Sequence, residues 1–132
     1  MNHIEKVKLI TCTCILVVAV LSGGILLRHF RPSRGVPYEI VSPEQAREYM
    51  EYESDYLCVD VSSAEDYAAG HMEGFINIPY EHLVEKAITE LPDAAQVIYV
   101  VAGDQETVEK ACRKLCELGY KSITLISEEA TE

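Results

Sequence analysis

The chain has 132 residues and a formal net charge of −11 at pH 7, a length suited to one small domain. Residues 1–35 carry a net charge of +4 (five Lys or Arg and one Glu), whereas residues 36–132 carry −15 (6 basic and 21 acidic side chains). A domain this acidic repels the phosphate backbone of nucleic acids, so nucleic-acid binding is excluded from the expected functions.

Residues 9–27 are a run of nineteen uncharged, mostly apolar residues that follows a polar, weakly basic tail, residues 1–8. As a helix rising 1.5 Å per residue, this run spans about 28 Å, close to the thickness of the hydrocarbon core of a bilayer. A helix that is apolar on every side cannot be buried in a soluble domain of this size. The sequence therefore predicts a transmembrane helix over residues 9–27, in contact with the lipid bilayer.

Small residues around Ser22 leave a cleaved signal peptide as an alternative. The apolar run continues to Leu27, however, and then meets an arginine cluster within residues 28–34, a flank typical of a retained single-pass anchor. These arginines outnumber the lysines of residues 1–8, and the positive-inside rule then places the following domain in the cytoplasm. Residues 28–36, broken by proline and glycine, are predicted to be a linker.

Strands and helices are expected to alternate through the rest of the chain. Tyr38–Val41 is predicted to be a strand, and Ser42 with the following proline opens a helix that runs to about Tyr52. The next predicted strand, 56–61, leads into a one-turn helix capped by Ser62 or Ser63. The Gly70–His71 pair is expected to end that helix with glycine in the left-handed conformation, before a short strand over residues 75–79.

The second half of the domain repeats this pattern. A helix is predicted over residues 80–91, with one buried face made of Leu83, Val84, Ala87, Ile88 and Leu91. The unbroken apolar run 96–102 is typical of a parallel strand buried on both faces. A turn over 103–106, a helix over 107–118 closed by Gly119, a strand over 121–126 and an acidic tail, 127–132, complete the chain. The predicted fold is an α/β domain over residues 37–126, with helices on both faces of a parallel sheet.

The segment Asp60 to Pro79 carries a motif: Asp-Val-Ser, then Asp-Tyr, Gly-His-Met-Glu-Gly-Phe and Asn-Ile-Pro. It resembles the hallmark of the rhodanese-like family, Asp-Val-Arg…Glu-Tyr…Gly-His-Ile-Pro-Gly-Ala…Asn-Ile-Pro, without a gap. Ser62, Asp66, Glu73 and Phe75 depart from that pattern. The resemblance implies the rhodanese-like fold. It also implies a loop after the strand 96–102 where sulfurtransferases of the family carry a persulfide-forming cysteine.

The position of that cysteine is occupied by a different residue here. Alignment by the strand puts Val100 there, and alignment back from the following helix puts Ala102 there. No cysteine occurs between Cys58 and Cys112, so neither alignment supplies a thiol. Neither valine nor alanine can form a persulfide.

The rest of the predicted ligand-binding loop is acidic rather than basic. Its residues are Val100, Val101, Ala102, Gly103, Asp104, Gln105 and Glu106. Carboxylates at a helix N-terminus favour the helix dipole and repel anions such as thiosulfate. We therefore expect these side chains to cap the helix, in a loop that is structural or recognises a neutral or cationic group. Asp60 is expected to bond loop backbone, and His71 to hold its turn together, both as supporting residues.

Two hypotheses of function follow. The first is a catalytically inactive rhodanese-like module, tethered to a membrane, that binds an unidentified protein or small molecule. The alternative is a sulfurtransferase that works through Cys58, Cys112 or Cys116. Because the histidines and cysteines lack metal-ligand spacing, no metal is expected, and no cofactor is expected either.

Overall fold

The computed structural model describes residues 35–131. The predicted N-terminal tail, the predicted transmembrane helix over 9–27 and nearly all of the predicted linker lie outside this range. Among residues 35–131, no helix combines the length and the apolar composition needed to cross a bilayer.

Five parallel strands form the sheet of the described chain, in the order β1-β5-β4-β2-β3. The central strand β4 pairs on one side with β2 and on the other with β5, so that Val100 lies opposite both Val59 and Leu125. All three side chains are fully buried, as the unbroken apolar run predicts. The bounds are β1 Glu39–Val41, β2 Tyr56–Asp60, β3 Ile76–Asn77, β4 Val97–Val101 and β5 Ser122–Ile126.

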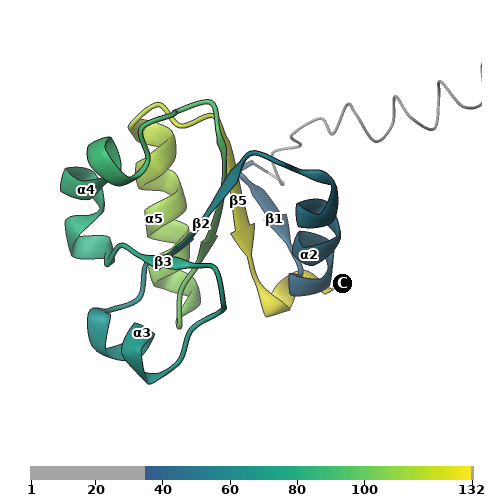
Figure 1. Cartoon of the computed structure of the whole chain (residues 1–132), viewed down its shortest axis with the longest axis horizontal. Helices are drawn as coiled ribbons and strands as arrows, with labels where there is room; N and C mark the ends of the chain where they lie inside the picture. The colour runs from purple at the N-terminus through teal and green to yellow at the C-terminus, as the bar shows by residue number, and fades with distance from the viewer. Residues whose placement is uncertain (1–34, 132) are drawn as a thin grey trace, which may run out of the picture.

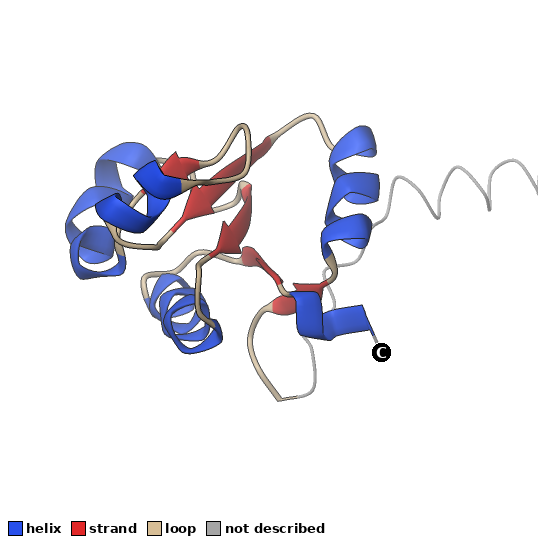
Figure 2. Ribbon diagram, turned by 90° about the horizontal axis from the view of Figure 1, so that it is seen from below, coloured by secondary structure: helices blue, strands red, loops and turns tan. Residues whose placement is uncertain are grey.

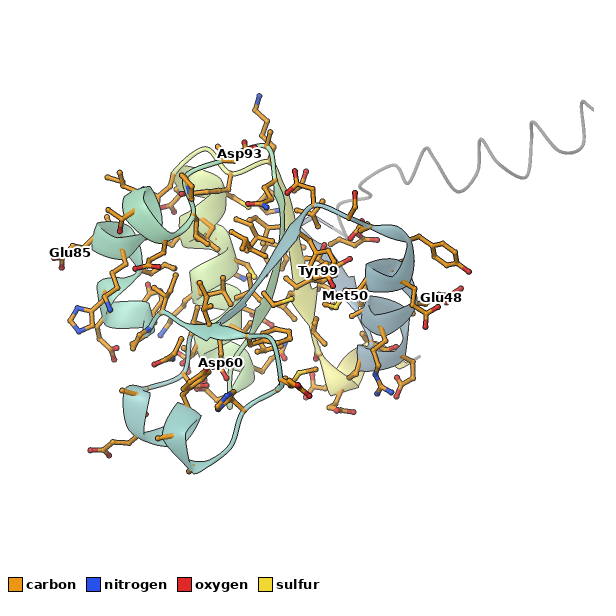
Figure 3. The ribbon with its side chains drawn as sticks, viewed as in Figure 1. Glu48, Met50, Asp60, Glu85, Asp93 and Tyr99 are labelled. Carbon is orange, nitrogen blue, oxygen red and sulfur yellow. The ribbon has the colours of Figure 1, made fainter. Side chains whose placement is uncertain are left out.

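Helices cover both faces of this sheet (Figures 1 and 2). Helices α4 and α5 pack on one face around Leu83, Ile98 and Leu115. Helix α2 packs on the other face over a smaller core that contains Tyr99 with Met50 at its margin, both labelled in Figure 3. The helices are α2 Pro43–Tyr52, α3 Ala64–Ala69, η1 Tyr80–His82, α4 Leu83–Glu90, α5 Gln105–Glu117 and η2 Glu128–Thr131.

Local sequence signals explain most helix boundaries. Ser42 and Gln45 form a reciprocal capping box at the start of α2, with distances of 3.2 and 3.0 Å, and proline occupies the first helical position. Ser63, rather than Ser62, caps α3 by accepting the Asp66 N–H at 3.1 Å. Gly119 follows α5 with φ +98°, a conformation that glycine adopts without strain.

Two local predictions are wrong. Val84 and Ile88 were expected on the buried face of α4, but they are 51% and 79% exposed. Only the narrower stripe of Leu83, Ala87 and Leu91 meets the core, because a single helix, α5, flanks α4. Gly70 was expected in the left-handed region, but its φ of 166° is extended backbone, so the chain leaves α3 in an extended conformation.

The turn after β4 and the carboxyl-terminal tail also differ from expectation. Helix α5 begins at Gln105 rather than at Thr107, since Asp104 already acts as its N-cap, so the loop is only residues 102–104. The tail is folded against the domain. The Ser127 N–H donates to the Val41 carbonyl at 2.9 Å, and a 3₁₀ turn, η2, follows.

All strands of the parallel sheet begin on one side, which we call the amino edge, and end on the opposite side, which we call the carboxyl edge. The described chain enters at the amino end of β1, where Val36 packs against the core and the Pro37 carbonyl contacts Cys116 of α5. The loops after β2 and β4, the N-terminus of α5 and the η2 turn gather at the opposite edge, where the strands end. In an α/β sheet, the carboxyl edge is where ligands bind.

Candidate functional site

A pocket of about 590 Å³ opens at the carboxyl edge of the sheet. Strand ends form its floor at Asp60, Val101 and Ile126. The residues after α3, the beginning of α5 and the η2 turn form its walls. We call this cavity the carboxyl-edge pocket.

Asp60 and Asn77 shape the loop that follows β2. The carboxylate Oδ1 of Asp60 accepts the Ser62 N–H at 2.9 Å, inside the protein. The Asn77 side-chain amide donates to the carbonyls of Asp60 and Ser62, both at 3.0 Å. Asp60 is 6% exposed and lines the pocket. It bonds loop backbone, as the sequence predicted, and it also forms part of the pocket floor.

The loop after β4 is joined directly to the loop after β2. The Gly103 N–H donates to the Ser62 hydroxyl oxygen at 3.0 Å. The next residue, Asp104, accepts the Thr107 N–H at 2.8 Å and so caps α5. Its pKa is lowered, first by that backbone hydrogen bond, then by one from the Thr107 side chain, and further by the nearby charge of Lys110. Side chains of the domain therefore occupy two of the N–H groups that an anion would bind here.

His71 stands at the pocket rim on the chain after α3. Its Nδ1 lies 2.8 Å from the Tyr67 carbonyl, and because a carbonyl can only accept, Nδ1 carries the hydrogen. The two rings stack, with centroids 3.7 Å apart. The Tyr67 hydroxyl in turn donates to the Phe75 carbonyl at 2.5 Å. His71 thus contacts Tyr67 within its own turn through both a hydrogen bond and ring stacking.

The carboxyl-terminal residues close the other side of the pocket. The Ser127 hydroxyl donates to Gln105 Oε1 at 3.1 Å, which joins η2 to the first turn of α5. Ser127, Glu128 and Glu129 all line the cavity. The segment that the sequence suggested as an acidic tail is therefore a pocket wall.

The charge of the pocket has one sign. Five carboxylate residues line it and no Lys or Arg does. Their combined field disfavours thiosulfate, phosphate and other anions and favours a cation. The five are Asp60, Asp66, Asp104, Glu128 and Glu129.

None of the three cysteines in the described part of the chain lines the pocket. Cys58 is buried beneath α2, and Cys112 is buried between α5 and the sheet. Cys116 is partly exposed, and its thiol contacts the Pro37 carbonyl at 3.5 Å, toward the amino edge of the sheet.

Burial acts on the pKa of all three thiols in the same direction. Burial raises the pKa of Cys58 to about 11. The pKa of Cys112 is raised well above its ordinary value, first by burial and then by the neighbouring Cys116 and Glu109. Burial also raises the pKa of Cys116. Because the thiolate is the reactive form, a raised pKa lowers the fraction of reactive thiolate at neutral pH.

The structure divides the predicted loop residues into two groups. Those at positions 101–105 line the pocket. Val100 does not, because it is fully buried within β4. Glu106 is outside the pocket lining and pairs with Lys110 at 2.5 Å on the surface of α5. Of the two positions suggested for the family cysteine, Ala102 faces the pocket and Val100 lies in the core.

Sequence reasoning missed several residues of the site. Ser62 and Asp66 follow the strand end that was already recognised, so the meeting of neighbouring strand ends in a parallel sheet could have suggested them. Nothing in the local pattern around Ser127–Glu129 predicted that the end of the chain folds over the pocket. Among residues 35–131, no three His, Cys, Asp or Glu side chains come together as a metal-binding group.

Comparisons with solved structures agree with this architecture. The Alr3790 protein from Anabaena sp. superposes with a TM-score of 0.61 at 24% identity, over 66% of this chain and 78% of that one. The human single-domain sulfurtransferase TSTD1 gives a TM-score of 0.58 at 22% identity, over 71% and 91%. A thiosulfate sulfurtransferase from Pseudomonas aeruginosa gives 0.60 at 21% identity, over 68% of this chain but 17% of its own.

These structural similarities show the fold, and a comparison with sequence families shows to which family the chain belongs. No curated protein matches the sequence significantly. The family model described as "Rhodanese-like domain" matches residues 42–129, which include every strand of the described sheet except β1. Members of this family include sulfurtransferases. The chain belongs to the rhodanese-like domain family.

Proposed function

We propose that this protein is a membrane-tethered rhodanese-like domain that does not transfer sulfur and acts as a binding or regulatory module. One observation carries the proposal: the pocket at the carboxyl edge is lined by carboxylates and by no thiol of the described chain. A sulfurtransferase of this family needs a thiolate to accept sulfur and an anion cradle to hold the donor. Here Ala102 lines the pocket without a thiol, and the Gly103 N–H is bonded to the Ser62 hydroxyl, which supports the proposal.

The proposed tether is compatible with an accessible pocket. The apolar segment 9–27 precedes the described residues, which begin at the amino edge of the sheet. The pocket opens at the opposite edge. A domain held by its amino-terminal side would therefore present the pocket away from the bilayer. The arginine cluster within residues 28–34 supports a cytoplasmic domain.

A sulfur-transfer assay tests the inactivity. The full chain, purified in detergent, is incubated with thiosulfate and cyanide, and thiocyanate is measured. We expect no turnover above the uncatalysed rate. Turnover that disappears in Cys58→Ala, Cys112→Ala or Cys116→Ala would show a sulfurtransferase with a non-standard cysteine and would overturn the proposal.

The tether and the orientation need a separate experiment. A reporter enzyme fused after Glu132 reports the side of the membrane that the domain occupies. We expect the membrane fraction to retain the fusion after alkaline extraction, with the reporter on the cytoplasmic side. Release of the fusion by alkali would contradict the tether, and a translocated reporter would contradict the orientation.

A further inference from the structure

We propose that the carboxyl-edge pocket binds the cationic end of a Lys or Arg side chain presented by a partner polypeptide. This inference rests on the proposed function and names the chemistry of the partner.

Asp60 is a buried residue whose side chain carries two carboxylate oxygens. Oδ1 accepts the Ser62 N–H, whereas Oδ2 has no hydrogen-bond partner among residues 35–131. Asp60 is 6% exposed and lies on the pocket floor, beside α3 (Figure 3). A buried polar atom without a partner costs free energy. An N–H donor that enters the pocket would remove that cost.

The donors around the pocket are mostly occupied already. The N–H groups of Ser62, Gly103 and Thr107 bond to side chains of the domain itself. The first two N–H groups of α5, at Gln105 and Glu106, have no partner within the helix, and an anion would need these two. The carboxylate of Asp104 lies at the same turn and repels an anion. Apart from these two N–H groups, the pocket presents carboxylate acceptors, so it favours a ligand that donates hydrogen bonds.

The charge of the ligand follows from the charge of the lining. Five carboxylate residues and no Lys or Arg face the cavity. Since no three potential metal ligands converge anywhere in residues 35–131, the donor set suits an organic cation with N–H groups. Hydrogen bonds between such a cation and a carboxylate are about twice as strong as bonds between neutral groups.

An apolar wall explains why the occupant is a long side chain. Val101, Ala102 and Ile126 line the pocket next to the carboxylates, and Met72 stands at the rim with 41% of its surface exposed. The methylene stem of Lys or Arg packs on apolar surface while its tip bonds a carboxylate. The cavity of about 590 Å³ has room for such a side chain.

The test uses the full chain in detergent and three peptides of sequence Gly-Xaa-Gly-amide, each with the same uncharged fluorophore on its amino terminus. Xaa is Arg, Lys or citrulline, the last a neutral analogue of Arg with nearly the same shape. We expect the Arg or the Lys peptide to bind at least about tenfold more tightly than the citrulline peptide. Equal binding of all three, or no binding of either cationic peptide, overturns the inference.

Matched variants locate the binding. Asp60→Asn keeps an oxygen for the Ser62 N–H and replaces the open oxygen by an NH₂ group, so we expect about tenfold weaker binding. Glu85→Gln removes the same charge from the surface of α4, away from Asp60 (Figure 3), and should change the affinity by less than about twofold. Equal effects of the two substitutions would mean a diffuse charge effect and would overturn the inference.

Glu129→Gln provides a second pocket variant if Asp60→Asn does not fold. It lies on the exposed pocket rim, and we expect it to weaken binding by about threefold, again against the Glu85→Gln control. An effect no larger than that of the control overturns the inference. Thiocyanate production would instead refute the proposed function, and absent cation binding without turnover refutes only this inference.

Discussion

The Ser62 hydroxyl accepts a hydrogen bond from the Gly103 N–H at 3.0 Å, and so joins two loops that are 41 positions apart in the chain. Ser62 is itself buried and follows β2, whereas Gly103 follows β4. These strands are neighbours in the sheet. The bond therefore links the two loops at the carboxyl edge through groups of the domain itself.

Ser62→Ala should destabilise the domain by about 1 kcal/mol. The substitution removes the acceptor of the Gly103 N–H and leaves that donor to solvent. Chemical denaturation followed by circular dichroism measures the change in the free energy of unfolding. Thr89→Ala, which removes an exposed local hydrogen bond on α4, is the control and should change it by less than about 0.5 kcal/mol. A null result for Ser62→Ala would mean that the bond between the loops contributes nothing to stability.

Ala102→Cys should place a reactive thiol in the pocket, whereas Val100→Cys should not. Ala102 lines the pocket and Val100 is fully buried in β4. Alkylation by iodoacetamide, quantified for each peptide by mass spectrometry, should be about tenfold or more faster at position 102, because the reagent needs an accessible thiolate. Equal rates would contradict the placement of these two residues.

Asp104 should make stability depend on pH. Hydrogen bonds from Thr107, first from its N–H and then from its side chain, lower the pKa of Asp104 below its ordinary value of 3.8. Because the pKa is lower in the folded state, the stabilisation is fully present above the ordinary value. It is lost as the pH falls through the folded-state pKa.

Asp104→Asn tests this pH dependence, because the amide oxygen still accepts the Thr107 N–H while the titratable group is gone. The melting temperature of the variant should lie below that of the original protein at pH 7, and the difference should shrink below about pH 4. Glu85→Gln controls for the loss of one surface charge. A difference that stays constant over this pH range would be inconsistent with the assigned hydrogen bonds.

Tyr120→Phe should destabilise the domain by about 1–2 kcal/mol. The buried Tyr120 hydroxyl lies 3.0 Å from the Ala87 carbonyl and 2.6 Å from the Leu91 carbonyl, and it secures the end of α4 to the core. Tyr52→Phe, at a side chain that is 68% exposed, should change the free energy of unfolding by less than about 0.5 kcal/mol. Similar values for the two variants would show that the Tyr120 hydroxyl is dispensable.

Much of the fold could be predicted because its signals are local. The Ser42 cap, the buried run in β4 and the Gly119 turn each depend on a few consecutive residues. Burial on α4 was predicted less well. Periodicity shows that Val84 and Ile88 lie beside the apolar stripe, but only the packing of α5 decides how wide a stripe is covered.

The sequence by itself determined the family, through the motif from Asp60 to Pro79, and it determined that no thiol occurs between Cys58 and Cys112. Only the tertiary structure decided which groups meet at the carboxyl edge. Ser62 reaches Gly103, and Ser127 reaches Gln105, because the strand order β1-β5-β4-β2-β3 brings together chain segments that are distant in sequence. Propensities and caps act over a few residues, whereas a pocket depends on long-range strand pairing that no local pattern contains.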